Sequence, residues 1–468
     1  MEASLANAPG IISDRKTLRR VILAASLGTL FEWYDFFLYG SLAVFFGGLF
    51  FAKGNETAQL LASLATFGAG FGVRPLGALV FGHLGDLIGR KYTFLVTMTA
   101  MGLSTALIGV LPTYATFGLG ATTLLVILRL IQGLALGGEY GGAATYVAEH
   151  VPDERRGFYT SFIQTTATLG FFLSMLVIAC TRSSMRADQF NSWGWRIPFL
   201  LSFPLLAVSL YIRVKMQESP LFAKAKSTGK TSKNPLREAF GSSLNRKYVF
   251  LALFGSTAGM GVVWYTGQFY ALTFLQSTLK LSWQTSYLLM SIALAVTCPF
   301  FVFFGWLSDR IGRNKVMLTG FALAALTYIP IYMGMAHFAN PNHLPVAVPS
   351  QINQPMLVLL IAIQIIYVCM VYGPTAAFLV ELFPTQIRYT SMSVPYHLGT
   401  GWFGGFLPLI ATAVTASAWA KQTLGSVSIF AGLFYPVGVC LMTLVVGSLF
   451  IRETKDHRLD TTEHPMQP

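Results

Sequence analysis

The sequence predicts an all-α membrane protein in which twelve transmembrane helices form two pseudo-symmetric six-helix halves. Three observations lead to this fold class: the low charge of the chain, twelve long apolar windows and an internal repeat. Of the 468 residues, 54% are hydrophobic and only 11% are charged, whereas about 25% of an ordinary soluble domain is charged. This composition excludes a disordered chain, a coiled coil and a nucleic-acid-binding domain.

Each apolar window is long enough to cross a bilayer, which takes roughly 20 residues. A strand in lipid could not satisfy its own backbone polar groups, so each window is predicted to be a helix. The first window is too long for the apolar core of a signal peptide and is therefore expected to be retained. The predicted spans cover residues 21–50, 57–84, 92–111, 121–148, 158–181, 197–214, 248–275, 284–307, 316–337, 355–380, 389–416 and 425–451.

The hydrophilic segments divide the chain into two halves, residues 21–214 and 248–451, joined by a basic linker at 215–247. Residues 1–20 and 452–468 form the tails. If the N-terminus is cytoplasmic, 24 of the 32 Lys and Arg residues fall on the cytoplasmic side and 6 on the other. This bias follows the positive-inside rule and predicts that both termini and the linker are cytoplasmic. The net charge of +13 thus reflects topology.

Three landmarks occur in both halves in the same order, which indicates a parallel internal repeat. The segment 82–91 (GHLGDLIGRK) recurs at 305–313 (GWLSDRIGR). A Glu-x-x-Pro-x-x-x-Arg loop occurs at 149–156 and again at 381–388. A Trp-Tyr pair occurs in the first and seventh spans, at 33–34 and 264–265.

The repeated loops, the twelve spans and the basic central segment resemble the major facilitator superfamily over essentially the whole chain. Within it, several motifs are similar to those of the metabolite:proton symporter family: Gly28-Thr29, Glu32-Trp33-Tyr34-Asp35-Phe36, Arg74-Pro75, Arg129-Leu130-Ile131-Gln132-Gly133, Gly137-Gly138-Glu139 and Trp193-Gly194-Trp195-Arg196. The segment 264–270 resembles the family's branch of haloacid and short-carboxylate permeases. The resemblance implies the major facilitator fold and proton-coupled import of small organic acids, betaines or proline, with the substrate bound between the halves.

Five ionisable side chains are predicted well inside the spans, where each costs about 2.5–3.5 kcal/mol to insert. They are Glu32, Asp35, Arg74, Arg129 and Glu139. We expect Asp35 and Arg129 to form the proton switch that related sugar symporters place in spans one and four. When the Arg is drawn away, desolvation favours the protonated form of Asp35.

Glu32 shares a helix face with Asp35 and is a second candidate for the proton. Glu139 is a further coupling candidate that could pair with Arg74. The alternative interpretation is that these charges only hold helices together as buried ion pairs.

Arg74 is the candidate anchor for a substrate carboxylate, because a guanidinium can bind it with two parallel hydrogen bonds. Anchoring the buried acids is the alternative role. The other candidate cavity residues are aromatic or carry an amide or imidazole: Tyr39, Gln164, Trp264, Tyr265, Gln268, Gln364, Tyr367, Tyr396 and His397. The alternative role of each tyrosine is packing between membrane helices. The alternative role of His397 is that of a core residue whose ring nitrogens are hydrogen-bonded within the protein.

The repeated loops are predicted to form a cytoplasmic gate that latches the halves together. Its acids would pair with its arginines, and an Asp can also cap a helix N-terminus. The predicted gate residues are Gly82, Asp86, Gly89, Arg90, Glu149, Arg156, Asp309, Gly312, Arg313, Glu381 and Arg388.

The expected function is import of a small organic anion, a mono- or dicarboxylate, with protons by alternating access in the bacterial inner membrane. The alternative is proton-coupled uptake of a zwitterionic osmolyte such as betaine or proline, held by aromatic rings. An enzyme is not expected, because no nucleophile elbow or HExxH motif occurs. We expect a monomer that needs no cofactor beyond the proton gradient. The four cysteines lack CxxC spacing, so they are taken as core residues without a disulfide or metal.

Overall fold

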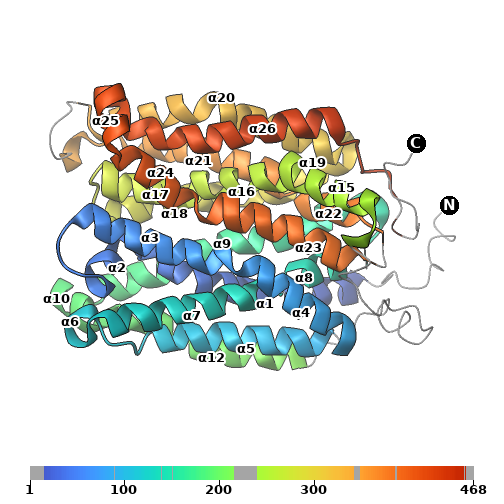
Figure 1. Ribbon diagram of the computed structural model, residues 1–468, viewed down its shortest axis with the longest axis horizontal. Coiled ribbons are helices and arrows are strands. Elements are labelled where there is room, and N and C mark those ends of the chain that lie inside the picture. Colours follow the sequence, from blue (N-terminus) through green and yellow to red (C-terminus); the bar gives the residue numbers. More distant parts are fainter. Residues whose placement is uncertain are drawn as a thin grey trace.

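A computed structural model describes residues 15–88, 90–138, 140–149, 151–214, 240–341, 348–384, 387–457 and 459. All regular structure in these ranges is helical, which confirms the predicted fold class. The helices run roughly parallel in two layers (Figure 1). Those from the first part of the chain, blue to green, form one layer, and those from the second part, yellow to red, form most of the other.

The helices before residue 215 are α1 (Arg15–Ser41), α2 (Ala43–Phe50), α3 (Glu56–Gly72), α4 (Arg74–Ile88), α5 (Arg90–Ile108), α6 (Tyr114–Phe117), α7 (Leu119–Gly137), α8 (Tyr140–Ala148), α9 (Arg156–Ser183), α10 (Ala187–Gln189), α11 (Arg196–Leu200) and α12 (Ser202–Val214). Those after residue 239 are α15 (Ser243–Ala252), α16 (Ala258–Tyr265), α17 (Ala271–Thr273), α18 (Trp283–Thr297), α19 (Pro299–Ile311), α20 (Arg313–Ala339), α21 (Gln354–Tyr372), α22 (Thr375–Leu382), α23 (Arg388–Leu398), α24 (Leu407–Ala416), α25 (Ala418–Leu424) and α26 (Phe434–Phe450). The π-helical turns are η3 (Phe190–Gly194), η4 (Leu253–Thr257), η5 (Thr266–Tyr270), η6 (Phe274–Thr278) and η8 (Gly399–Gly405), and the 3₁₀ turns are η2 (Asp153–Arg155), η7 (Pro349–Gln351) and η9 (Gly425–Leu433).

Within the described residues, nine continuous helices are long and apolar enough to cross a membrane, and two bent pairs raise that number to eleven. The bent pairs are α1 with α2, at 61°, and the segment 187–194 with 196–211, at 41°. The shorter apolar helix Leu95–Ile108 accounts for the remaining predicted crossing. The boundaries follow capping residues: Asn55 accepts hydrogen bonds from the backbone N–H groups of the first turn of α3, and Ser282 caps α18 in the same way.

Close helix packing places the second span against the fourth. A Cβ added at Gly133 would collide with the carbonyl oxygen of Gly70, and one added at Gly77 would collide with the carbonyl oxygen of Leu134. Both obstacles are backbone atoms, so any larger side chain would push α3 and α4 away from α7. This contact brings Arg74 and Arg129 into the same part of the bundle.

The α-helical hydrogen-bond pattern of the second span breaks for one residue at Val73, between α3 and α4, within the continuous apolar helix Glu56–Phe81. Pro75 has no N–H to donate to the carbonyl four residues earlier, so the helix ladder is incomplete there. The indole N–H of Trp402, in η8, donates to the carbonyl oxygen of Gly72 over 3.0 Å. A side chain of the eleventh span thus bonds to the interruption in the second.

Two cysteines differ from the prediction that all four are core residues. Cys369 and Cys440 are buried, whereas Cys180 is exposed and Cys298 is half-buried. In a membrane helix the lipid-facing side and the buried side are both apolar, so apolar neighbours in the sequence do not show which side a cysteine is on. The prediction was wrong for Cys180 and Cys298.

Candidate functional site

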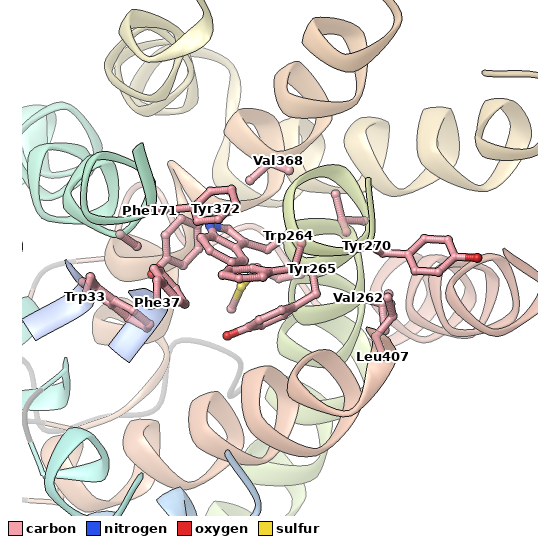
Figure 2. Packing of buried hydrophobic residues seen from close by; sticks show 14 of the residues in the cluster. Trp33, Phe37, Phe171, Val262, Trp264, Tyr265, Tyr270, Val368, Tyr372 and Leu407 are labelled. Atoms are coloured by element: carbon pink, nitrogen blue, oxygen red, sulfur yellow. The ribbon is translucent and has the colours of Figure 1, made fainter. Parts of the chain in front are cut away.

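A small cavity of about 10 Å³, with room for roughly one water molecule, lies between helices from both parts of the chain. Most of its wall is aromatic (Figure 2). The lining residues are Trp33, Phe37, Ala167, Met260, Trp264, Tyr265, Tyr372, Tyr396 and Thr400. They come from α1, α9, α16, α21, α23 and η8, so a ligand in this cavity would contact both halves.

Three of the rings form a continuous stack across the interface. Phe37 lies between Trp33, at 4.9 Å between ring centroids, and Trp264, at 5.1 Å. The interplanar angles are 25° and 24°. Phe269 of η5 packs on Phe37 at 4.9 Å and on Phe171 at 4.4 Å. Phe269 and Phe171 thus extend the aromatic wall beyond the residues that line the cavity.

Arg74 lies behind this wall at the start of α4. Its side chain is fully buried, and none of its guanidinium nitrogens has a hydrogen-bond partner among the described residues. The guanidinium carbon is 5.4 Å from the Trp33 ring centroid and 5.2 Å from that of Phe71. Burying a charge without a partner is costly, so an anion beside this guanidinium would stabilise it.

Phenol and imidazole groups surround Arg74. It interacts electrostatically with Tyr140, Tyr265, Tyr372, Tyr396 and His397. The Tyr396 hydroxyl lies near the guanidinium without the geometry of a hydrogen bond. Instead the hydroxyls of Tyr372 and Tyr396 share a hydrogen bond of 2.9 Å, and Tyr140 stacks on Tyr396 with ring centroids 3.5 Å apart.

Arg129 has a different environment from the predicted one. Its Nη1 donates to Gln132 Oε1 over 2.7 Å and to the carbonyl oxygen of Phe36 over 3.3 Å. The guanidinium also lies 4.2 Å from the ring centroid of Phe36 and 4.8 Å from that of Tyr39. No ion pair joins Arg129 to Asp35 in the ranges that the structure describes, so the expected pairing is not present in this conformation.

The two acids of the first span are buried without a cation. Both carboxylate oxygens of Glu32 and Oδ1 of Asp35 have no hydrogen-bond partner within the described part of the chain. Asp35 lies beside Ser202 of α12, on a different side of α1 from Trp33. Glu139 lies outside the described residues.

Several other predicted cavity residues serve the surrounding structure. Tyr39 donates to the carbonyl oxygen of Ser63, Gln164 to that of Tyr372, and Gln268 to Thr168 Oγ1. Gln364 donates to the carbonyl oxygen of Leu360 and contacts Met335. Tyr367 accepts from Thr327. His397 is buried beside Tyr396, with neither ring nitrogen bonded to a described residue.

Of the predicted substrate residues, only Trp264, Tyr265 and Tyr396 line the cavity directly. Phe37, Met260, Tyr372 and Thr400 also line the cavity and were not predicted from the sequence. In a wholly apolar helix no polar face shows which side points inward, so these residues carry no periodic signal.

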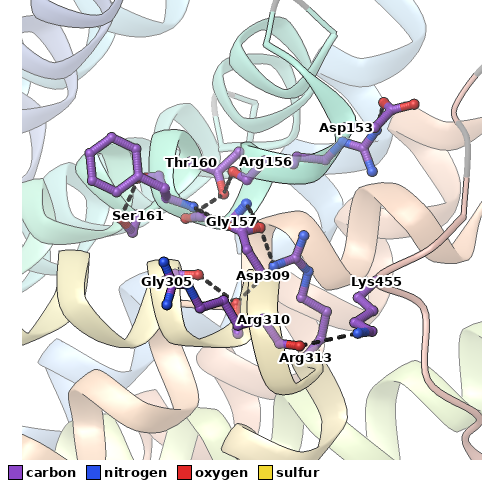
Figure 3. Close-up of polar contacts among 12 residues, drawn as sticks. Asp153, Arg156, Gly157, Thr160, Ser161, Gly305, Asp309, Arg310, Arg313 and Lys455 are labelled. Carbon is purple, nitrogen blue, oxygen red and sulfur yellow. Dashed lines mark hydrogen bonds and ion pairs between the residues drawn. The ribbon is translucent and has the colours of Figure 1, made fainter. Parts of the chain in front are cut away.

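A second polar cluster joins the halves at the end of the bundle where α26 ends (Figure 3). Glu381 is fully buried and accepts from Arg156 Nη1 over 2.8 Å and from Arg313 Nη2 over 3.1 Å. Arg156 belongs to the first half and the other two residues to the second. Asp153 also pairs with Arg156.

Two more contacts of this gate cross between the halves. Arg388 Nη1 donates to Glu149 Oε1 over 3.2 Å. The carboxylate of Asp309 accepts from the backbone N–H groups of Gly157 and Phe158, each over 2.8 Å. These N–H groups open α9, where the helix dipole favours a negative charge.

The predicted gate residues Glu149, Arg156, Asp309, Arg313, Glu381 and Arg388 therefore lie together. Gly312 has a φ of 117°, which favours glycine, and begins the loop into α20. Gly82, Asp86, Gly89 and Arg90 lie outside the residues whose side chains the structure describes.

The segment after α26 belongs to the same cluster. Glu453 accepts from the backbone N–H groups of Arg313 and Asn314, which caps the start of α20. The Thr454 hydroxyl is buried and donates to Glu381 over 2.8 Å. The arginines at 156 and 388 donate to the backbone carbonyls of residues 457 and 459, each over 3.4 Å. The segment 451–459 thus ties the tail to the gate.

A family model described as "Major Facilitator Superfamily" matches residues 25–394 of the chain. The shikimate transporter of Escherichia coli K12 is 33% identical over 91% of this chain and 91% of that protein. The alpha-ketoglutarate permease of the same strain is 32% identical over 98% of this chain and 100% of that protein. Its proline/betaine transporter is 32% identical over 96% of this chain and 86% of that protein.

The fold agrees with a solved member of the superfamily. The structure of the proton:xylose symporter XylE aligns with a TM-score of 0.72, covering 94% of this chain and 97% of that one at 19% identity. The relatives named above are metabolite transporters. The chain is therefore a multi-pass transporter of the major facilitator superfamily and not an enzyme.

Proposed function

We propose that this transporter imports a small organic anion together with protons by alternating access. It acts as a monomer in a bacterial inner membrane, with both termini in the cytoplasm and the proton gradient as its only energy source. The gate then lies on the cytoplasmic side. In this orientation the rings of Phe269 and Phe171 would lie on the periplasmic side of the cavity, and with the gate closed the conformation would be occluded.

The unpartnered guanidinium of Arg74 is the observation that carries the proposal. It is a buried cation beside a cavity formed by both halves, and no described acid neutralises it. A ligand carboxylate would supply the missing charge and two acceptor oxygens. Because the anion would also contact rings of the second half, its arrival would favour the closed state of both halves.

Proton coupling is assigned to Asp35, with Glu32 as a second candidate. Both are buried in the first span, and neither forms an ion pair with a cation in the described ranges. A buried unpaired carboxylate is costly, so a proton that neutralises it would let the site reorient more easily. Arg129 would form an ion pair with Asp35 in another conformation of the transport cycle.

Uptake of betaine or proline is the second candidate. The ring-lined cavity suits a quaternary ammonium through cation–π contacts, and the carboxylate of a zwitterion could reach Arg74. The proline/betaine relative is as similar to this chain as the alpha-ketoglutarate relative. The two candidates share the anion site and differ in what fills the rest of the cavity.

The test is uptake into proteoliposomes with and without an imposed inward proton gradient. Labelled carboxylates and betaine are compared for wild type, Arg74→Gln and Arg74→Lys. We expect a carboxylate to accumulate only with the gradient, and Arg74→Gln to abolish uptake. Lys421→Gln, which removes an exposed charge at the other end of the bundle, is the matched control. Full uptake of carboxylates by Arg74→Gln would overturn the proposal.

A further inference from the structure

We infer that Arg182, Trp283 and Tyr287 form a second gate between the halves and position them in the closed state. The second gate lies where α1 and α9 end, next to α2 and α10, at the end of the bundle away from the chain termini (Figure 1). The inference rests on alternating access, which is part of the proposed function, and it is independent of the ligand. It follows from three contacts that cross between the halves.

Tyr287 joins the eighth span to the first. Its buried hydroxyl donates to the backbone carbonyl oxygen of Ser41 over 2.7 Å. Ser41 is the last residue of α1, at the 61° bend between α1 and α2. Its own hydroxyl shares a hydrogen bond of 2.8 Å with the hydroxyl of Ser174 in α9. Tyr287 therefore bonds to the first half at a point where the first and fifth spans are already held together.

Arg182 joins the fifth span to the eighth through aromatic rings. It lies in the last turn of α9, and its guanidinium carbon is 4.5 Å from the ring centroid of Trp283 and 5.1 Å from that of Phe190. Trp283 begins α18 in the second half, whereas Phe190 belongs to η3 in the first. Arg182 forms no ion pair with any acid in the described ranges. A cation over a ring face thus links the halves here.

The two contacts of α18 form one unit, because Tyr287 packs edge-on against Trp283 with ring centroids 6.1 Å apart. The third contact joins the seventh span to the first. A Cβ added at Gly40 would lie 2.3 Å from Cε1 of Phe269, so the Phe269 ring occupies the space in front of this glycine. All three contacts must break before the halves can part at this end.

The fifth span meets the eighth at both of its ends. At the gate, a Cβ added at Gly157 would lie 2.5 Å from the carbonyl oxygen of Gly305. At the second gate, Arg182 lies over Trp283. Both ends are closed in this structure, which agrees with a cavity that holds roughly one water molecule. Opening toward either side of the membrane therefore requires one set of contacts to break while the other holds.

Distances between spin labels test the second gate without a ligand. Labels at Ser184 and Gln284 are exposed on its two sides, and Cys180→Ser with Cys298→Ser removes the thiols that are not fully buried. We expect Tyr287→Phe, which loses a hydrogen bond, to raise the ratio of open to closed second gates about two- to tenfold.

Two further variants and a control accompany Tyr287→Phe. Arg182→Gln should raise the same ratio by about two- to tenfold, whereas Arg182→Lys keeps a cation for the Trp283 ring and should raise it less. Tyr92→Phe removes the hydroxyl of an exposed tyrosine in α5, outside the second gate, and should match wild type. Wild-type distances in both Tyr287→Phe and Arg182→Gln would overturn the inference.

A second pair of labels, at Glu154 and Lys315, separates gating from loosened packing. In alternating access the two gates do not open together, so Tyr287→Phe added to Asp309→Asn should lower the fraction of open gates at Glu154 and Lys315. Long distances that grow at both ends would show general loosening and overturn the second gate. If Asp309→Asn opens the gate but no variant opens the second gate, the inference fails and alternating access stands. If neither end opens in any variant, alternating access fails as well.

Discussion

Asp309→Asn tests whether the gate holds the two halves together. Both carboxylate oxygens of Asp309 accept backbone N–H groups from the start of α9, over 2.8 Å each. Asparagine has one acceptor oxygen, and its NH₂ group would face a second donor. The ion pair between Asp309 and Arg313 lies within the second half, so it is present whether the gate is closed or open. Losing it therefore changes the free energy of both states by about the same amount.

The expected size of the effect follows from the contacts of Asp309 that cross between the two halves. Losing at least one hydrogen bond to a charged group costs about 1.5–3 kcal/mol, and losing the charge at the helix N-terminus costs ~0.3–1 kcal/mol. The closed gate should therefore weaken by about 2–4 kcal/mol. At 1.4 kcal/mol per factor of ten, the ratio of closed to open gates falls roughly 30-fold to several hundred-fold.

Distances between spin labels measure this shift directly. Labels at Glu154 and Lys315, exposed on opposite sides of the gate, should show a larger fraction of long distances in Asp309→Asn. Asp188→Asn changes the charge equally at an exposed site outside the gate and should behave as wild type. If Asp309→Asn and the control give the same distance distribution, the carboxylate does not hold the gate. Glu149→Gln, which removes the separate contact to Arg388, gives an independent reading if the first variant folds poorly.

Three further predictions concern the proton, the packing and the tail. Asp35→Asn should abolish gradient-driven accumulation in proteoliposomes while substrate exchange survives; normal accumulation would exclude Asp35 as the proton carrier. Gly133→Ala should destabilise the bundle by ~1–3 kcal/mol through overpacking, seen as a lower melting temperature than in Gly48→Ala, where the added methyl meets open space. Burial is the main cause that lowers the pKa of His457; Arg388 and Arg156 add to it, and Glu381 and Asp153 oppose it. Docking of the tail is therefore favoured above the ordinary histidine pKa of about 6.5 and weakens as the pH falls below that value. A spin label at Asp456 should become more mobile between pH 8 and pH 5, and this change should vanish in His457→Gln.

The gate shows how much of a structure an internal sequence repeat can predict. Matching loops in the two halves predicted which acids and arginines would cluster, because repeats place equivalent loops at equivalent positions. The partners within the cluster were not predictable. Arg156 crosses to Glu381 and Arg388 to Glu149, so each arginine bonds to the acid of the other half's loop, which spacing along one loop does not encode.

Asp35, Arg74 and Arg129 are buried, as their positions in the spans indicated, but the expected pair of Asp35 with Arg129 is not formed in this conformation. Insertion cost identifies Asp35, Arg74 and Arg129 as unusual in a span, but their neighbours depend on helix rotation. Gln132, which binds Arg129, lies three residues away on the same helix face, a signal that was available in the spacing. The role of Thr454 had no such signal, because a short polar tail looks the same whether it is solvated or docked.

The interruption at Val73 gives the candidate anion site a mechanical property. Arg74 is the first residue beyond the turn that lacks a hydrogen bond because of Pro75. A slight change in the angle between α3 and α4 would move the guanidinium. The indole N–H of Trp402 donates to the carbonyl oxygen of Gly72, on the other side of that turn. Motion of the eleventh span would therefore be transmitted to the ligand's counter-charge without passing through the ligand.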